Sequence, residues 1–399
     1  MGRRASRPGL RLIHPYSRLP MNRTNLPIAE WLSRLVQIPS VTPDQAGPRA
    51  GQSGEAAMAA ALAGWFAAFG GQVEWHEVLP GRSSVYATWR GATDRWLAVD
   101  AHTDTVGVEQ MSDPPFDGRI ADGRVYGRGA VDTKATLAVV LALLEGMHKA
   151  GARPKHNLFI AATVDEETGA TGAPGFADWL GERGIVFDEL VVAEPTGCTP
   201  VHGHKGLVRL EFTVHGQTAH SAQPHLGRNA ITAGARVALA LEEEHNRLQS
   251  LQASALGIPQ LTVVMMHGGL GRNVVPDRCT VALDRRLVDG EDPQAVTAQL
   301  IALAEAASPL PLTTEVWRQI VAFYQPADSG LVSRMAAWSG QTPTVAPYGT
   351  NAWAYGLAAK ERIVLGPGSI DQAHGAVEWV EIDELAKLAG IYARWWGLG

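Results

Sequence analysis

Residues 158–167 read LFIAATVDEE, an apolar run that ends in three consecutive acids. A short, continuous apolar run is typical of a β-strand that is buried on both faces. Residues 96–104, WLAVDAHTD, and residues 190–194, LVVAE, have the same design, in which a buried run leads into metal-capable side chains. Strands of this kind belong to parallel sheets that helices cover on both faces, so the three segments indicate an α/β domain.

Strand-like and helix-like segments alternate around these runs, and their character changes near residue 204. From there the strands alternate apolar and polar residues, as in a sheet with one solvated face, and the first pattern returns after Pro311. We therefore predict a doubly wound, mostly parallel-sheet domain over 23–203 and 313–399, interrupted by an α+β domain at 204–312. The predicted helices cover 28–36, 54–69, 130–150, 229–248, 293–306 and 383–396; the predicted strands cover 72–78, 85–89, 96–100, 158–164, 190–193, 207–214, 261–266 and 280–287.

Composition excludes several classes of protein. The chain has 399 residues, a formal net charge of −6 and 46% hydrophobic residues, which is typical of a globular protein of two domains. Residues 1–22 are predicted to form a basic tail, with a transit peptide as the alternative. The rest of the chain has a more negative net charge than the whole, which argues against a nucleic-acid-binding protein. The longest apolar run, Leu137–Leu144, is too short to span a membrane. Two cysteines provide no disulfide framework and fit a cytoplasmic location.

Metal-capable residues follow all three buried strands. The carboxyl ends of parallel strands meet at one edge of the sheet, where ligands gather. Two further candidates are an Asp at the predicted start of a long helix and a His in a Gly/Pro-rich loop. Each alone has an ordinary explanation, such as a helix cap or a solvated turn, but together they predict a metal site. The candidates are His102, Asp132, Glu166, Glu167, Glu194 and His374.

Two His and three carboxylates suit a borderline divalent ion, with zinc first and cobalt or manganese as alternatives. Five side chains are too many for one catalytic zinc, so we predict two ions bridged by Asp132. Asp104, two residues after His102, is predicted to orient that imidazole. Of Glu166 and Glu167, one is predicted to be a ligand and the other a general base, and the spacing does not distinguish them.

The pattern resembles a known family, the co-catalytic zinc amidohydrolases that include acetylornithine deacetylase, succinyl-diaminopimelate desuccinylase, aminoacylase and glutamate carboxypeptidase. Five separated motifs carry the resemblance, in family order: AHTD at 101–104, GRGAVD at 127–132, DEETG at 165–169, EPT at 194–196 and AH at 373–374. The resemblance implies that Glu166 is the base, that His102 and Glu194 bind one metal, and that Glu167 and His374 bind the other.

The segment at 204–312 resembles the family's lid and dimerisation domain, with the signature GQTAHSAQP at 216–224. The resemblance implies a homodimer in which His220 reaches the partner's site and supports the oxyanion. It also implies that Asn273 and Arg286 bind substrate, although strand alternation does not choose between Arg285 and Arg286. Gly349 and Thr350 resemble residues of a substrate loop.

The resemblance is strongest to the acetylornithine deacetylase branch, which predicts removal of an N-acyl group from an amino acid. A dipeptidase, a glutamate carboxypeptidase-like or a desuccinylase-like enzyme is the alternative, and a non-catalytic descendant is disfavoured because all five ligand positions are filled. One departure is Asn351, where relatives often carry Asp, and we interpret it as a change on the substrate side.

Overall fold

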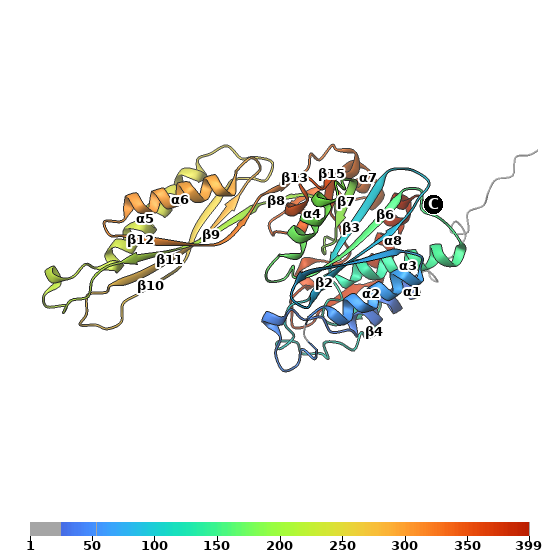
Figure 1. Ribbon diagram of the computed structural model, residues 1–399, viewed down its shortest axis with the longest axis horizontal. Helices are drawn as coiled ribbons and strands as arrows, with labels where there is room; N and C mark the ends of the chain where they lie inside the picture. The colour runs from blue at the N-terminus through green and yellow to red at the C-terminus, as the bar shows by residue number, and fades with distance from the viewer. Residues whose placement is uncertain (1–24, 53, 399) are drawn as a thin grey trace, which may run out of the picture.

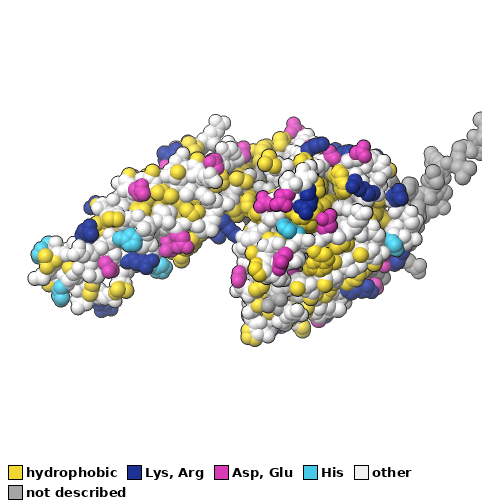
Figure 2. All heavy atoms as spheres, in the orientation of Figure 1, with side chains coloured by type: hydrophobic (Ala, Val, Ile, Leu, Met, Phe, Trp, Pro, Cys, Tyr) yellow, Lys and Arg dark blue, Asp and Glu magenta, His cyan; other side chains and the backbone are white. Residues whose placement is uncertain are grey.

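The computed structural model describes residues 25–52 and 54–398, and the predicted tail at 1–22 lies outside them. Figure 1 shows a large α/β domain and an elongated smaller domain, residues 206–320, that extends away from it. In the space-filling view a wide notch separates the two (Figure 2). The chain therefore forms a split larger domain with an insertion, the arrangement that the change of pattern near residue 204 predicts.

The described part of the larger domain contains a nine-stranded sheet, in the order β1-β2-β6-β3-β7-β15-β8-β13 with β14 also beside β8. Strands β6, β3, β7 and β15 run parallel at its centre, whereas β1 and β2 add an antiparallel edge. The predicted mostly parallel sheet is thus confirmed. Its strands are β1 (Gln72–Leu79), β2 (Arg82–Trp89), β3 (Trp96–His102), β6 (Asn157–Thr163), β7 (Phe187–Val192), β8 (Val201–His204), β13 (Phe323–Tyr324), β14 (Thr344–Ala346) and β15 (Ala359–Val364).

Helices cover both faces of this sheet, as expected for a doubly wound domain. Helices α1, α2, α3 and α8 pack on one face and α4 packs on the other (Figure 1). The short sheet β4 (Ile120–Ala121), β5 (Arg124–Tyr126) and β16 (Trp379–Glu381) lies outside the large sheet. The helices of this domain are α1 (Asn25–Val36), α2 (Ala56–Ala68), α3 (Lys134–Ala150), α4 (Gly172–Glu182), α7 (Gly330–Ser339) and α8 (Ile382–Trp396).

Some predicted boundaries differ from the structure. Helix α3 begins at Lys134 and not at Ala130, because the residues before it form a loop whose backbone bonds to side chains elsewhere in the fold. The periodicity predicts neither α4 nor α7. Helix α4 is missed because it begins with Gly172 and contains Pro174 and Gly175, which are poor helix formers. These boundaries depend on tertiary contacts and not on local pattern.

The smaller domain is an antiparallel sheet, in the order β10-β11-β9-β12, packed against α5 (Ala230–Gln249) and α6 (Pro293–Ala307). Its strands are β9 (Gly206–His215), β10 (Gln260–Gly268), β11 (Arg278–Leu287) and β12 (Leu312–Ile320). The predicted limit at residue 312 leaves out β12, which pairs with β9. Most of β12 is exposed, so it lacks a clear apolar pattern after Pro311. In the described range, no helix combines the length and apolar character needed to cross a membrane.

Candidate metal centre

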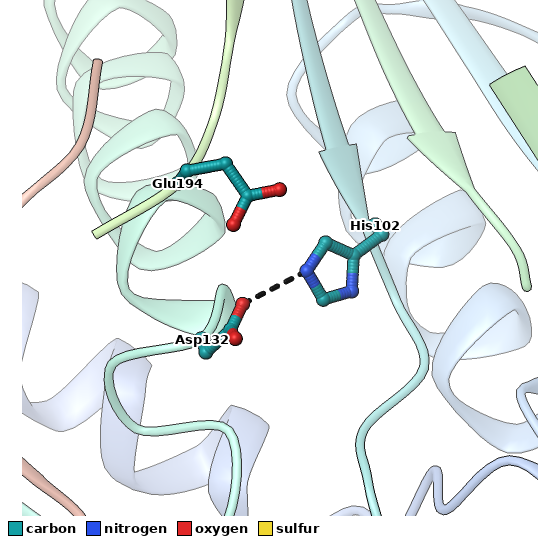
Figure 3. Close-up of side chains that lie close together, drawn as sticks. All are labelled: His102, Asp132 and Glu194. Carbon is teal, nitrogen blue, oxygen red and sulfur yellow. Dashed lines mark hydrogen bonds and ion pairs between the residues drawn. The ribbon is translucent and has the colours of Figure 1, made fainter. Parts of the chain in front are cut away.

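The carboxyl edge of the central strands holds a first group of possible metal ligands. His102 is the last residue of β3, Glu194 follows β7, and Asp132 lies in the loop before α3. Figure 3 shows these side chains facing one another, with His102 Nε2 2.9 Å from Asp132 Oδ1. All three are buried, and one ligand atom from each lies within 4.8 Å of the others. This group can hold one metal ion.

A second group shares Asp132 with the first. His374 Nε2 lies 3.2 Å from Asp132 Oδ2 and 3.2 Å from Glu167 Oε2. One carboxylate oxygen of Asp132 therefore faces His102 and the other faces His374. The structure thus brings all five predicted ligands together, in two groups that have only Asp132 in common.

The carboxylates of Glu166, Glu167 and Glu194 disfavour their charged forms. Burial raises the pKa of Glu166 to about 8 and that of Glu167 to about 7, and the negative charge of Asp132 adds to both shifts. Burial, followed by the charge of Asp132, raises the pKa of Glu194 well above its ordinary value. Asp132 differs, because hydrogen bonds from two imidazoles outweigh its burial and lower its pKa. Divalent cations would relieve this crowding of negative charge, and two imidazoles with three carboxylates are donors that suit them.

Glu166 and Glu167 differ in their contacts. The Glu167 carboxylate faces His374, whereas no hydrogen bond or ion pair from a described residue engages the Glu166 carboxylate. Glu166 is nevertheless held in place, because its backbone N–H donates to Asp104 Oδ1 (3.1 Å) and that of Glu167 to Asp104 Oδ2 (3.0 Å). The two acids are therefore fixed side by side with only one carboxylate engaged.

Asp104 is closer to these backbone amides than to the imidazole it is predicted to orient. Its carboxylate Oδ1 lies 3.5 Å from His102 Nδ1, while its backbone oxygen lies 3.0 Å from that nitrogen. The backbone oxygen accepts the Nδ1 proton, which leaves Nε2 facing Asp132. Asp104 thus joins β3 to the loop that carries the two glutamates.

The loop that follows β6 has a second anchor in Asp165. The Asp165 backbone is left-handed (φ 59°), and its carboxylate accepts hydrogen bonds from Thr168 and Thr171. Arg82 Nη1 donates to Asp165 Oδ1 at 2.8 Å and also pairs with buried Glu55. These contacts fix the start and the end of the turn around Glu166.

A buried ion pair of two residues that are not among the predicted site residues, Arg128 and Glu378, holds the Asp132 loop. Glu378 accepts from the backbone N–H groups of Val131 (3.0 Å) and Asp132 (3.3 Å), and Arg128 Nη1 lies 2.5 Å from its other oxygen. Arg128 lies within the quoted motif GRGAVD, and Glu378 lies four residues after His374. No local pattern distinguishes them from surface charges, because they meet across 250 residues of sequence.

The predicted residues of the smaller domain lie apart from these groups. His220 pairs with Val274 in a short bridge, next to the hydrogen bond from Ser221 N–H to the Asn273 carbonyl. Both His220 and Asn273 are exposed, and within the described chain no hydrogen bond or ion pair joins them to the metal groups.

The neighbouring arginines on β11 have different partners. Arg285 is buried and pairs with Glu291, whereas Arg286 is partly exposed and its Nε lies 2.7 Å from Asp284 Oδ1. The Arg285 guanidinium is therefore engaged in the core of the smaller domain, and Arg286 is the more accessible of the two.

The predicted substrate loop packs against β3 and β8. Gly349 is exposed, and the Thr350 N–H donates to Nε2 of buried His204 (3.3 Å). Asn351 is buried, and its Nδ2 donates to Asp100 Oδ2 (3.2 Å). Asn351 thus has a structural partner, and its interpretation as a change on the substrate side stays a prediction. An Asp at this position would face the Asp100 carboxylate, so the amide has a structural reason.

Several known proteins are similar to this chain over most of their length. The model of peptidase family M20/M25/M40 matches residues 98–397. The acetylornithine deacetylase of Proteus mirabilis is 29% identical over 364 residues, 88% of this chain and 92% of that enzyme. Two solved structures share the fold: a family M20 metallo-carboxypeptidase of Sulfolobus solfataricus (TM-score 0.73, 19% identity, 93% of this chain and 98% of that one), and a dinuclear metal-binding M20 peptidase of Bacillus subtilis (TM-score 0.69, 14% identity, 94% and 98%).

The family match spans all five motifs and leaves out the first part of the larger domain. The relatives cover both domains. The resemblance noted in the sequence is therefore confirmed. This chain belongs to peptidase family M20/M25/M40 and is a metal-dependent hydrolase of amide bonds.

Proposed function

We propose that the protein is a dinuclear metal enzyme that removes an N-acyl group from an amino acid. The observation that carries this proposal is the sharing of Asp132 between two ligand groups, with the unengaged carboxylate of Glu166 beside them. The similarity to acetylornithine deacetylases supports an acylated amino acid as the substrate class.

In this proposal His102 and Glu194 would hold one ion, Glu167 and His374 would hold the other, and Asp132 would be shared between the two groups. Zinc suits the donor set first, with cobalt and manganese as alternatives. When bound, the ions polarise the acyl carbonyl and lower the pKa of water toward neutrality.

The chain's own residues then move the proton. Glu166 accepts a proton from the attacking water and passes it to the leaving amine nitrogen. Its pKa of about 8 in the metal-free centre reflects burial first, and bound cations would lower that value toward the range of a base at neutral pH. Asp104, through the backbone amides of Glu166 and Glu167, keeps the proton acceptor in position.

Arg286 and Asn273 are the proposed substrate contacts of the smaller domain. A guanidinium recognises a carboxylate through two parallel hydrogen bonds, and every amino-acid product of this reaction carries a carboxylate. Arg286 suits this role better than Arg285, because Arg285 is buried whereas Arg286 is partly exposed. Gly349 and Thr350 are proposed to line the site from the larger domain.

A substrate panel tests the proposed reaction. Purified protein loaded with Zn²⁺ or Co²⁺ is expected to hydrolyse N-acetyl amino acids at least tenfold faster than dipeptides, and a chelator is expected to abolish turnover. Release of the free amine would be measured. Faster cleavage of dipeptides would favour the dipeptidase alternative, and turnover that survives metal removal would contradict the proposed mechanism.

We also propose that the protein is a homodimer formed through the smaller domain. Strand β10 is the outer strand of its sheet, and Val264, Met265 and Met266 on it are exposed. Leu239 on α5 is also exposed, and a cavity of about 580 Å³ lies between α5 and β10. An exposed apolar edge strand is a template for pairing with another chain, and a second copy of this chain would cover it.

The partner's His220 would complete the site in such a dimer. His220 is exposed, and its Nδ1 accepts the Ala222 N–H, which leaves Nε2 as a donor for an oxyanion. The two buried cysteines are both free, so we propose a reducing cytoplasmic location for the enzyme.

A mixing experiment tests the sharing of His220. Glu166→Gln and His220→Ala homodimers are each expected to be inactive, but in a mixed dimer the His220→Ala subunit keeps Glu166 and receives an intact histidine. At equal amounts of the two variants, about half of the dimers are mixed, and each mixed dimer has one competent site out of two. About one quarter of wild-type activity is therefore expected. No recovery after verified subunit exchange would contradict a shared histidine.

A further inference from the structure

Arg318 joins the smaller domain to the turn that carries Glu166 and Glu167. It lies near the end of β12, and its Nη2 donates to the backbone oxygen of Thr168 (3.0 Å) and to that of Gly169. The pairing of β12 with β9 shifts register between Val316 and Arg318, so Trp317 is an extra residue at a bulge. Bulges re-aim the neighbouring side chains, and here the arginine reaches the other domain.

The same turn is held from its other side by the larger domain. The backbone N–H groups of Glu166 and Glu167 donate to Asp104, and those of Gly169 and Thr171 donate to Asp165. Acids of the larger domain therefore bind the amides of the turn, while a cation of the smaller domain binds its carbonyl oxygens. No carboxylate among the described residues pairs with Arg318, so the turn is its polar partner.

The connection between the two domains is otherwise narrow. The chain enters the smaller domain between β8 and β9 and leaves it between β12 and β13. These two segments are packed tightly, since a Cβ added at Gly206 would lie 2.6 Å from the backbone nitrogen of Ala322. Apart from the bond of Lys205 Nζ, in the entering segment, to the Ile258 backbone oxygen (2.6 Å), Arg318 makes the only hydrogen bonds that described residues form between the two domains.

Domains joined by a small interface are expected to move relative to one another. A hydrogen bond that crosses the interface, such as those of Arg318, responds to such a motion. We propose that Arg318 is a positioning residue that couples the orientation of the smaller domain to the turn bearing Glu166. Its two charge-assisted hydrogen bonds stabilise the turn when the domains adopt the orientation seen here. The inference rests on the proposed function in one respect, the role of Glu166 as the base.

The test compares Arg318→Met and Arg318→Lys with wild type, and with Arg247→Met as the matched control. Arg247 is an exposed arginine of the same domain that pairs with Glu244 on its own helix. Hydrogen–deuterium exchange of residues 164–172 is measured first, because it needs no turnover. Arg318→Met removes hydrogen bonds from a charged donor, so exchange of this segment is expected to become about tenfold faster. Arg247→Met removes none of these bonds and is expected to leave the exchange rate of the segment unchanged.

The kinetic readout separates positioning from substrate binding. Arg318→Met is expected to lower kcat by about tenfold with KM within about twofold of wild type, and Arg318→Lys to recover part of both effects because its ammonium can bond one carbonyl. Unchanged exchange at 164–172, or faster exchange with unchanged kcat, would overturn the proposal. If hydrogen–deuterium exchange becomes equally faster in β9 and the Tm falls, the substitution destabilises the protein in general, and the proposal is overturned too. If the wild type hydrolyses no substrate of the panel, the proposed function fails while the exchange experiment still decides the coupling.

Discussion

Replacing Glu166 with glutamine is expected to lower kcat by about 10³-fold while both metal ions remain bound, because general acid–base groups typically contribute 10²–10⁴-fold. Glutamine keeps the size of the side chain and the backbone contacts to Asp104, but it cannot accept the proton from water. Since the Glu166 carboxylate has no described partner, its replacement leaves no other group unpaired. Turnover of an N-acyl amino acid and metal content per subunit are the two measurements.

Glu182→Gln is the control for this substitution, since Glu182 is an exposed residue at the end of α4. It is expected to retain wild-type kcat. If Glu166→Gln keeps more than a tenth of wild-type activity, another group acts as the base. If it loses metal instead, Glu166 is a ligand and the assignments of Glu166 and Glu167 exchange.

Replacing Asp132 with asparagine is expected to lower kcat/KM by about 10⁴-fold, because metal polarisation contributes several kcal/mol and about 1.4 kcal/mol is a tenfold change in rate. Asp132 is the only residue common to both ligand groups, so one substitution weakens both sites. The amide has the same shape as the carboxylate, and the loop keeps its hydrogen bonds from Val131 and Asp132 N–H to Glu378. Metal content is expected to fall from two ions per subunit to one or none.

The matched control is Asp122→Asn, in an exposed turn whose left-handed backbone suits asparagine. This variant should bind and hydrolyse as the wild type does. Retention of two tightly bound ions by Asp132→Asn would contradict the bridging role. Retention of one ion with nearly full activity would show that a single metal suffices.

Much of the centre is predictable because parallel strands end at a common edge. The runs at 96–100, 158–164 and 190–193 are each followed by a His or an acid, and the topology of a parallel sheet then brings these side chains together. The order of the motifs identifies the family, and the α/β pattern identifies the fold. The inference of the fold needs only periodicity and strand ends, which are local properties of the chain, whereas the inference of the family needs the resemblance of the motifs as well.

Other features depend on contacts between distant segments. The sequence does not separate Glu166 from Glu167, and the difference between them in the fold is that His374 engages only one. It does not separate Arg285 from Arg286, whose burial depends on Glu291 and the neighbouring strands. In each pair, two identical residue types are adjacent, so pattern alone assigns them equal weight.

By itself, the sequence determined the α/β class and the inserted domain, because strand burial is encoded locally, and it predicted five candidate ligand positions from strand ends and motifs. Only the tertiary structure decided which residues support them. Glu378 reaches the Asp132 loop, and Arg318 reaches the turn after Glu167, across long stretches of chain. Hydrogen bonds between segments so far apart leave no periodic signal, since their partners are neighbours only after the sheet has formed.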